Sequence, residues 1–138
     1  NNWERKWNNL ASTVKNKRAK LIIITASPEL NNSYTLPQHC LPNFFNKDGG
    51  NHPGCYIDTK EYKESFKKVD LLFNNLKINF PDTVFLIDPF DYLCNEKGCK
   101  VFSKQIKNSI LFDSHHITKE ASLLLQPAFE QINTKDKL

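Results

Sequence analysis

The sequence predicts an α/β fold in which a parallel sheet is covered by helices on both faces. Two apolar runs, Leu21–Thr25 and Val84–Ile87, lack the polar alternation of half-exposed strands and are typical of strands buried on both sides. A helical pattern precedes the first run, and a second helical pattern lies between the two. Because a long crossover through a helix joins the runs, we expect the two strands to be parallel.

The first helix is expected from Trp3 to about Arg18. Its apolar residues recur at helical spacing and form one face of an amphipathic helix, with Lys, Arg and Asn on the other face. We expect this apolar face to pack into the core, since core packing is a far commoner use of paired tryptophans than a ligand platform. Its members are Trp3, Trp7, Leu10 and Val14.

A long segment from Glu29 to Tyr56 follows the first strand and is rich in proline and glycine. Segments of this length without regular structure are unusual in compact domains and are either functional or tethered. Because loops after parallel strands line ligand sites in open α/β sheets, four residues are candidate substrate contacts: His39, Phe44, Phe45 and His52. The alternative is a surface loop, which we favour for the two histidines, with the aromatic pair pinning the segment onto the core.

The second helix is expected to begin at the capping box Asp58-Thr59-Lys60-Glu61 and to stop at Pro81. Its buried face should consist of Tyr62, Phe66, Val69, Phe73 and Leu76.

A polar segment from Asp88 to Lys107 follows the second strand. Asp88 and Asp91 allow an acid-base or metal-binding interpretation. Aspartates at loop starts more often form turns, so we leave both out of the catalytic set.

The last elements are a short buried strand, Ile110–Phe112, and a final helix that begins at Thr118. We expect Pro127 to kink this helix near Leu123, because proline removes one helical hydrogen bond. The helix should pack behind the preceding turn with its apolar residues inward: Ala121, Leu124, Leu125, Ala128 and Ile132.

Asp113 and His116 lie three residues apart in the turn between this strand and this helix. At that spacing the carboxylate can accept a hydrogen bond from one imidazole nitrogen and leave the other free as a base. The pair predicts an orienting acid and a general base without a nucleophile. A solvated loop of common turn residues is the alternative.

The segment Asp113–Thr118 resembles the last conserved block of the SGNH hydrolase superfamily, Asp-x-x-His followed by an apolar residue and Ser or Thr. Lys20–Glu29 and Val84–Cys99 resemble, in order, a strand that runs into Pro-Glu and a strand ending in Asp-Pro before a cysteine-flanked loop. The likeness is to the extracytoplasmic SGNH domain at the C-terminal end of bacterial membrane acyltransferases that O-acetylate surface polysaccharides. It covers about Trp3 to Ile132, with one departure: Glu120 stands where the family usually has glycine.

The resemblance implies a three-layer, flavodoxin-like fold in which His116 is the general base and Asp113 orients it. It also implies a nucleophilic serine and oxyanion-hole residues from earlier blocks. Neither Gly-Asp-Ser nor Gly-x-Asn-Asp occurs in the 138 residues. We therefore expect residues 1–138 to be the C-terminal portion of a single SGNH-like domain, inactive alone, with N-terminal strands and the serine lying upstream and an apolar strand edge exposed.

The implied activity is acyl transfer from a donor, supplied by an upstream membrane acyltransferase domain of the same protein, to a sugar hydroxyl of a polysaccharide or glycolipid. No cofactor or metal is implied, and the place is the periplasmic side of a bacterial inner membrane. Two alternatives are an SGNH esterase that uses water as the acceptor and an inactive, disulfide-linked glycan-binding module.

Four cysteines allow three pairings, and the loops that they flank favour Cys40 with Cys55 and Cys94 with Cys99. A zinc site competes, although the spacings fit the usual paired-cysteine knuckles poorly, and reduced buried thiols are the third possibility. Disulfides would place the domain in an oxidising compartment.

The net charge is +4, from 19 basic and 15 acidic residues, and the basic residues are scattered. We expect no nucleic-acid partner, because such a partner requires a clustered basic patch. No apolar segment approaches the roughly 20 residues that span a bilayer. The chain has neither a start Met nor a signal peptide, so we expect a cut or processed N-terminus.

Overall fold

A computed structural model describes residues 2–30, 37–44, 47, 53–95 and 98–134. The chain has the α/β class expected from the sequence, with helices and a small parallel sheet. It divides into two compact units. Unit 1 combines the chain up to Ala26 with Lys63–Asp88, and unit 2 combines Ser27–Tyr62 with the chain from Pro89 onward.

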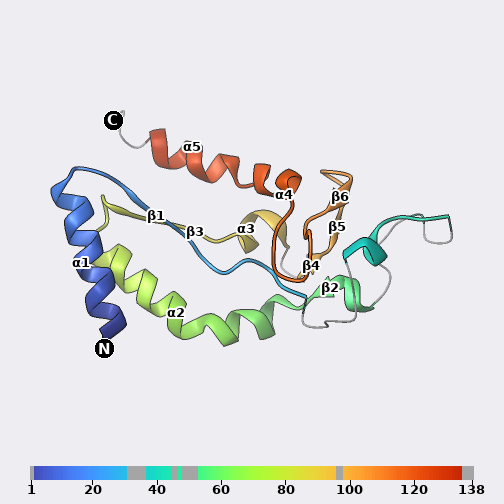
Figure 1. The fold of residues 1–138 in the computed structure, drawn as a ribbon, viewed down its shortest axis with the longest axis horizontal. Coiled ribbons are helices and arrows are strands. Elements are labelled where there is room, and N and C mark those ends of the chain that lie inside the picture. Colours follow the sequence, from blue (N-terminus) through green and yellow to red (C-terminus); the bar gives the residue numbers. More distant parts are fainter. Residues whose placement is uncertain (1, 31–36, 45–46, 48–52, 96–97, 135–138) are drawn as a thin grey trace. The chain divides into compact units, whose positions relative to one another are not determined.

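Unit 1 contains the parallel strands β1 (Leu21–Ile24) and β3 (Val84–Ile87), which lie side by side (Figure 1). Leu21 is opposite Val84 and Ile24 is opposite Ile87. The helices are α1 (Asn2–Asn16) and most of α2 (Thr59–Asn79). The expected parallel β-α-β unit is confirmed.

The core of unit 1 gathers side chains from both helices and both strands: Ala11, Ile23, Phe73, Leu76 and Val84. Trp7 packs edge-on against Phe73, with ring centroids 5.1 Å apart. The expected apolar face of α1 is wrong at two positions, because Trp3 is 60% exposed and Leu10 is 43% exposed. The face that meets the core is centred on Ala11 and Trp7.

One face of β1 remains open. The core includes Ile23 and partly buried Leu21, whereas the side chains of Ile22 and Ile24, which point to the opposite face, are exposed. Burial on both faces was expected from the unbroken run of apolar residues, so that expectation is wrong for β1 in the part of the chain described. The core packing of unit 1 covers a single face of this strand.

Helix α2 begins and ends as its sequence predicts. The Asp58 carboxylate caps it by accepting a hydrogen bond of 2.7 Å from the backbone N–H of Lys60, and the helix ends at Asn79, before Pro81. Of its expected buried face, Tyr62, Phe73 and Leu76 are buried, Phe66 is half-buried and Val69 is exposed.

Unit 2 is built from short elements. Strand β2 (Tyr56–Ile57) pairs antiparallel with β4 (Cys99–Lys100), and β5 (Phe102–Ser103) pairs antiparallel with β6 (Asn108–Ser109). Its helical segments are η1 (Pro37–Cys40), η2 (Pro53–Cys55), α3 (Phe90–Leu93), α4 (Lys119–Leu123) and α5 (Gln126–Thr134). The polar segment from Asp88 to Lys107 therefore carries regular structure that its composition did not predict.

The expected third buried strand, Ile110–Phe112, is wrong. Ile110 and Leu111 are buried, but Phe112 is 76% exposed, and the run joins no strand of the described sheet. Its backbone is bonded locally instead, since Ile110 donates to Val101 and Phe112 donates to the carbonyl of His116. These nearby partners satisfy the backbone without a neighbouring parallel strand.

The final helix is broken into two: α4 ends at Leu123 and α5 begins at Gln126. The break lies where the sequence predicted a kink, near Leu123. Pro127 occupies the first turn of α5, where the missing N–H costs little. The expected inward residues Ala121, Leu125, Ala128 and Ile132 are buried, and Leu124 is half-buried.

Both disulfides lie in unit 2. The structure joins Cys40 to Cys55 and Cys94 to Cys99, the connectivity chosen from the sequence. No cysteine remains free to bind zinc. Cys40 and Cys55 are fully buried, so their bond ties the proline- and glycine-rich segment to the interior.

Replacing Cys40 and Cys55 together with alanine is expected to lower the free energy of unfolding by about 3 kcal/mol, because their bond closes a loop of about 15 residues in the unfolded chain. The matched double variant of Cys94 and Cys99, which opens a loop of 5 residues, should cost only about 2 kcal/mol. Denaturant unfolding of the two variants measures the difference. The reverse order would contradict the loop-closure argument.

Candidate active site

The turn from Asp113 to His116 is organised around one carboxylate. Asp113 Oδ1 accepts two backbone hydrogen bonds of 2.8 Å, from the N–H groups of His115 and His116. Asp113 Oδ2 lies 2.8 Å from Nδ1 of the His116 ring. One side chain therefore both shapes the turn and orients an imidazole.

The side chain of His116 is largely open to solvent. The His116 side chain is 78% exposed and that of Asp113 is 45% exposed. Among the described residues, none forms a hydrogen bond with Nε2 of His116. When Nδ1–H donates to the carboxylate, Nε2 carries the lone pair of a general base.

Hydrogen bonds on both sides fix the ends of this turn. The N–H of Phe112 donates to the carbonyl of His116 over 2.7 Å, which closes the turn at its base. Thr118 caps α4 by accepting from the N–H of Ala121, and its hydroxyl donates to the carbonyl of Ser109 over 2.8 Å. The turn is thus held by the strand before it and the helix after it.

A further hydrogen bond reaches the turn from the Pro-Glu segment. The N–H of Leu30 donates to the carbonyl of Ser114 over 3.0 Å, and Leu30 is buried. The neighbouring Glu29 carboxylate acts on Tyr62, whose pKa is raised by burial first and by this negative charge second. The segment that follows β1 therefore contributes to holding the Asp113 turn.

His115 occupies a different environment from His116. Its Nδ1 lies 2.5 Å from the hydroxyl of Ser114, and no described carboxylate contacts its ring. The structure therefore distinguishes the two adjacent histidines, since only His116 has an aspartate partner among the described residues.

The pKa of the Asp113 carboxyl group is held well below its ordinary value. The backbone N–H of His115 has the largest effect, followed by the His116 ring and the backbone N–H of His116, since all three favour the charged form. A carboxyl group whose pKa is lower in the folded state stabilises the fold above its unfolded pKa of about 3.9. That stabilisation is lost as the pH falls through the folded value.

We expect the Asp113 carboxyl carbon to show no titration by ¹³C NMR between pH 7 and about pH 3.5, where an unperturbed aspartate would already be more than half protonated. In the His116→Ala variant the pKa should rise only in part, because the largest contribution comes from the backbone of His115. A midpoint near the unperturbed value of about 3.9 in the unmodified protein would contradict the hydrogen-bonded turn.

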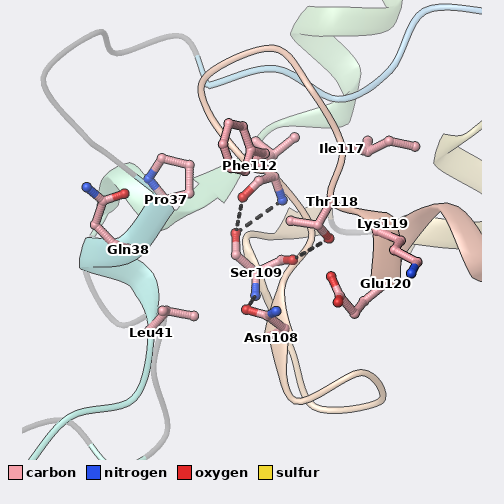
Figure 2. A pocket seen from close by; sticks show the side chains of 11 residues that line it. Pro37, Gln38, Leu41, Asn108, Ser109, Phe112, Ile117, Thr118, Lys119 and Glu120 are labelled. Carbon is pink, nitrogen blue, oxygen red and sulfur yellow. Dashed lines mark hydrogen bonds between the residues drawn. The ribbon is translucent and has the colours of Figure 1, made fainter.

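A cavity of about 450 Å³ adjoins the turn in unit 2 (Figure 2). Its walls come from η1 and the residue after it, from β6 and the run that follows, and from the start of α4. Figure 2 shows the η1 side facing the α4 side, with Ser109 between them. The lining residues are Pro37, Gln38, Leu41, Asn108, Ser109, Leu111, Phe112, Ile117, Thr118, Lys119 and Glu120.

The structure separates the other sequence candidates from this cavity. His39 and Phe44 are exposed and do not line it, while Phe45 and His52 lie outside the described residues. Asp88 forms an ion pair of 3.4 Å with Lys63 in unit 1. Three other members of the long segment line the cavity instead, namely Pro37, Gln38 and Leu41.

Sequence reasoning missed the polar cavity residues Gln38, Asn108 and Lys119. It also assigned Phe112 to a buried strand. The run Ile110–Phe112 is uniformly apolar, so the sequence contains no alternation that marks its last residue as exposed. Glu120 was noted as a departure, and the structure puts it in the cavity wall.

Two kinds of feature are absent from the described residues. Among them, no cluster of three or more histidine, cysteine, aspartate or glutamate side chains is arranged to hold a metal ion. Within the same residues, every helix falls short of the length and apolar character needed to cross a membrane.

Comparison with known proteins gives one match. A family model described as "SGNH domain (fused to AT3 domains)" matches residues 2–131. Searches of curated proteins and of solved structures find no match. The matched range includes both ends of the turn and the whole cavity wall.

Proposed function

Because this chain belongs to the family of SGNH domains that are fused to AT3 domains, we propose that it transfers an acyl group to a sugar hydroxyl with His116 as general base and Asp113 as its orienting acid. The chain is an SGNH module of the type associated with acyltransferases. The observation that carries the proposed roles is the 2.8 Å contact between Asp113 Oδ2 and His116 Nδ1, next to an exposed ring.

In the first half of the reaction, Nε2 of His116 takes the proton of a serine hydroxyl, whose oxygen attacks the acyl carbonyl. The bond between the acyl carbon and the donor breaks, and His116 returns the proton to the departing group. Asp113 stabilises the imidazolium formed between these steps. The product of this half-reaction is an acyl-serine.

In the second half, Nε2 of His116 takes the proton of a sugar hydroxyl. The sugar oxygen attacks the acyl-serine carbonyl, the bond to the serine oxygen breaks, and that oxygen recovers the proton. Acyl transfer to water would follow the same steps with hydroxide in place of the sugar oxygen. The two reactions therefore differ only in what occupies the acceptor position.

The nucleophilic serine in this proposal belongs to a segment N-terminal to the chain, so that residues 1–138 form the C-terminal portion of one SGNH domain. The supporting fact is that the sequence contains neither Gly-Asp-Ser nor Gly-x-Asn-Asp. We also propose that the acyl donor reaches the serine from the AT3 domain. The oxidised cysteines support a periplasmic location for the module.

The test is acetyl transfer by the intact protein in membranes, with deacetylated surface polysaccharide as the acceptor. We expect acetyl incorporation into the polysaccharide to exceed release of free acetate. A fluorophosphonate probe should label one serine, and peptide mapping should locate it outside residues 1–138.

Each of three results would contradict part of this proposal. Free acetate without incorporation would make the protein an esterase. Labelling of a serine within residues 1–138 would contradict the upstream nucleophile. Glycan binding with neither labelling nor acetyl transfer would indicate an inactive binding module.

A further inference from the structure

Resting on the proposed acyl transfer, we propose that the cavity beside the turn is the acceptor subsite and that it binds one hexopyranose ring, with Phe112 as its stacking platform. The cavity volume of about 450 Å³ falls within the range of small-molecule sites. It lies wholly in unit 2, between η1, β6 and the start of α4.

Phe112 is the first argument for a sugar. It is 76% exposed although the two residues before it are buried. An exposed phenylalanine side chain leaves a large apolar surface in contact with water, which is unfavourable unless a ligand covers it. Its ring offers such a ligand a flat, electron-rich face. Pyranose rings carry C–H groups on one face with a matching partial positive charge, and such a face stacks on an aromatic ring.

The polar walls are the second argument. Gln38 and Asn108 contribute carboxamides, Glu120 a carboxylate and Lys119 an ammonium group. Together they present both donors and acceptors, as a ring of hydroxyl groups requires. An acyl chain would desolvate these groups without replacing their hydrogen bonds. An anion would meet the Glu120 carboxylate next to Lys119, the one lysine among the described lining residues.

The third argument is the link between the platform and the base. Phe112 and His116 are joined through the 2.7 Å hydrogen bond from the N–H of Phe112 to the carbonyl of His116. Leu111 and Ile117, which flank this pair, form an antiparallel bridge and both line the cavity. A ring held on Phe112 therefore lies against the same closed turn that carries the general base.

The first experiment measures binding by saturation-transfer NMR on the intact protein in detergent. The probes are the methyl glycosides of glucose, galactose, mannose, N-acetylglucosamine, rhamnose and fucose, with methoxycyclohexane as the non-sugar control. At least one glycoside should bind, with transfer concentrated on the C–H protons of one ring face. Phe112→Ala should weaken this binding about tenfold, and Phe112→Trp should restore it.

Phe44→Ala is the matched control, since Phe44 is also a highly exposed phenylalanine of unit 2 but does not line the cavity. This variant should bind as the unmodified protein does. Failure of all six glycosides to bind, or equal binding by Phe112→Ala, would overturn the subsite. Loss of binding in Phe44→Ala would do the same, because the effect would then not belong to the cavity.

The second experiment separates this proposal from the proposed function. In acetyl-transfer assays, Phe112→Ala should raise KM for the deacetylated polysaccharide about tenfold. Fluorophosphonate labelling of the serine should keep its normal rate, because the platform contacts only the acceptor. Unchanged KM with normal transfer would overturn the subsite alone. Phe112-dependent glycoside binding without any acetyl transfer would overturn the proposed function and leave the sugar site in place.

Discussion

Replacing His116 with alanine is expected to lower the turnover of acetyl transfer by about four to six powers of ten, as loss of the base in a serine triad does. Without the imidazole, the proposed reaction loses the group that takes the proton of the serine hydroxyl. The measurement is acetyl incorporation into deacetylated polysaccharide by membranes that contain the intact protein. Fluorophosphonate labelling of the serine should fall in parallel.

His115→Ala is the matched control for this variant. Its ring is adjacent in the chain but contacts the Ser114 hydroxyl and has no aspartate partner among the described residues. We expect turnover close to that of the unmodified protein. Equal losses in the two variants would contradict the assignment of the base to His116.

Replacing Asp113 with asparagine is expected to lower turnover by about four powers of ten while leaving the fold intact. The amide oxygen of asparagine can still accept the N–H groups of His115 and His116, which shape the turn. Its NH₂ group would face Nδ1 of His116 at the position of the present 2.8 Å contact. Because that group donates, Nδ1 must then accept, and the ring proton moves to Nε2, where it removes the base.

Asp113→Ala provides the comparison that separates orientation from folding. It loses the ring contact and both backbone hydrogen bonds of the turn, so its thermal unfolding midpoint should fall, whereas that of Asp113→Asn should change little. Both variants should turn over several powers of ten more slowly than the unmodified protein. If Asp113→Asn kept near-normal turnover, the carboxylate would not be setting the tautomer of His116.

The sequence predicted the contact between Asp113 and His116 better than it predicted the strand before them. Asp113 and His116 are close along the chain, so their contact depends on a local turn that Asp and Ser favour. The run Ile110–Phe112 was assigned to a strand because its composition is apolar throughout. Whether such a run joins a sheet depends on which backbone groups lie beside it, and here these are Val101 and His116.

The sequence by itself determined the features that follow from local patterns or from the connection between two elements. These are the parallel β-α-β unit, the cap at Asp58, the helix break at Pro127 and the Asp113–His116 pair. Each follows from local hydrogen bonding, from proline geometry or from the strand direction that a helical crossover requires.

Only the tertiary structure decided which apolar side chains are buried and which residues share a cavity. Trp3 and Phe112 are large apolar residues of the kind usually found in a core, but both are exposed. Burial depends on which side chains pack opposite them. The cavity joins Gln38 to Asn108 and Glu120 across long sequence separations. Packing between segments that are distant in the sequence produces that arrangement. The hydrophobic periodicity of one segment does not show which other segment will pack against it.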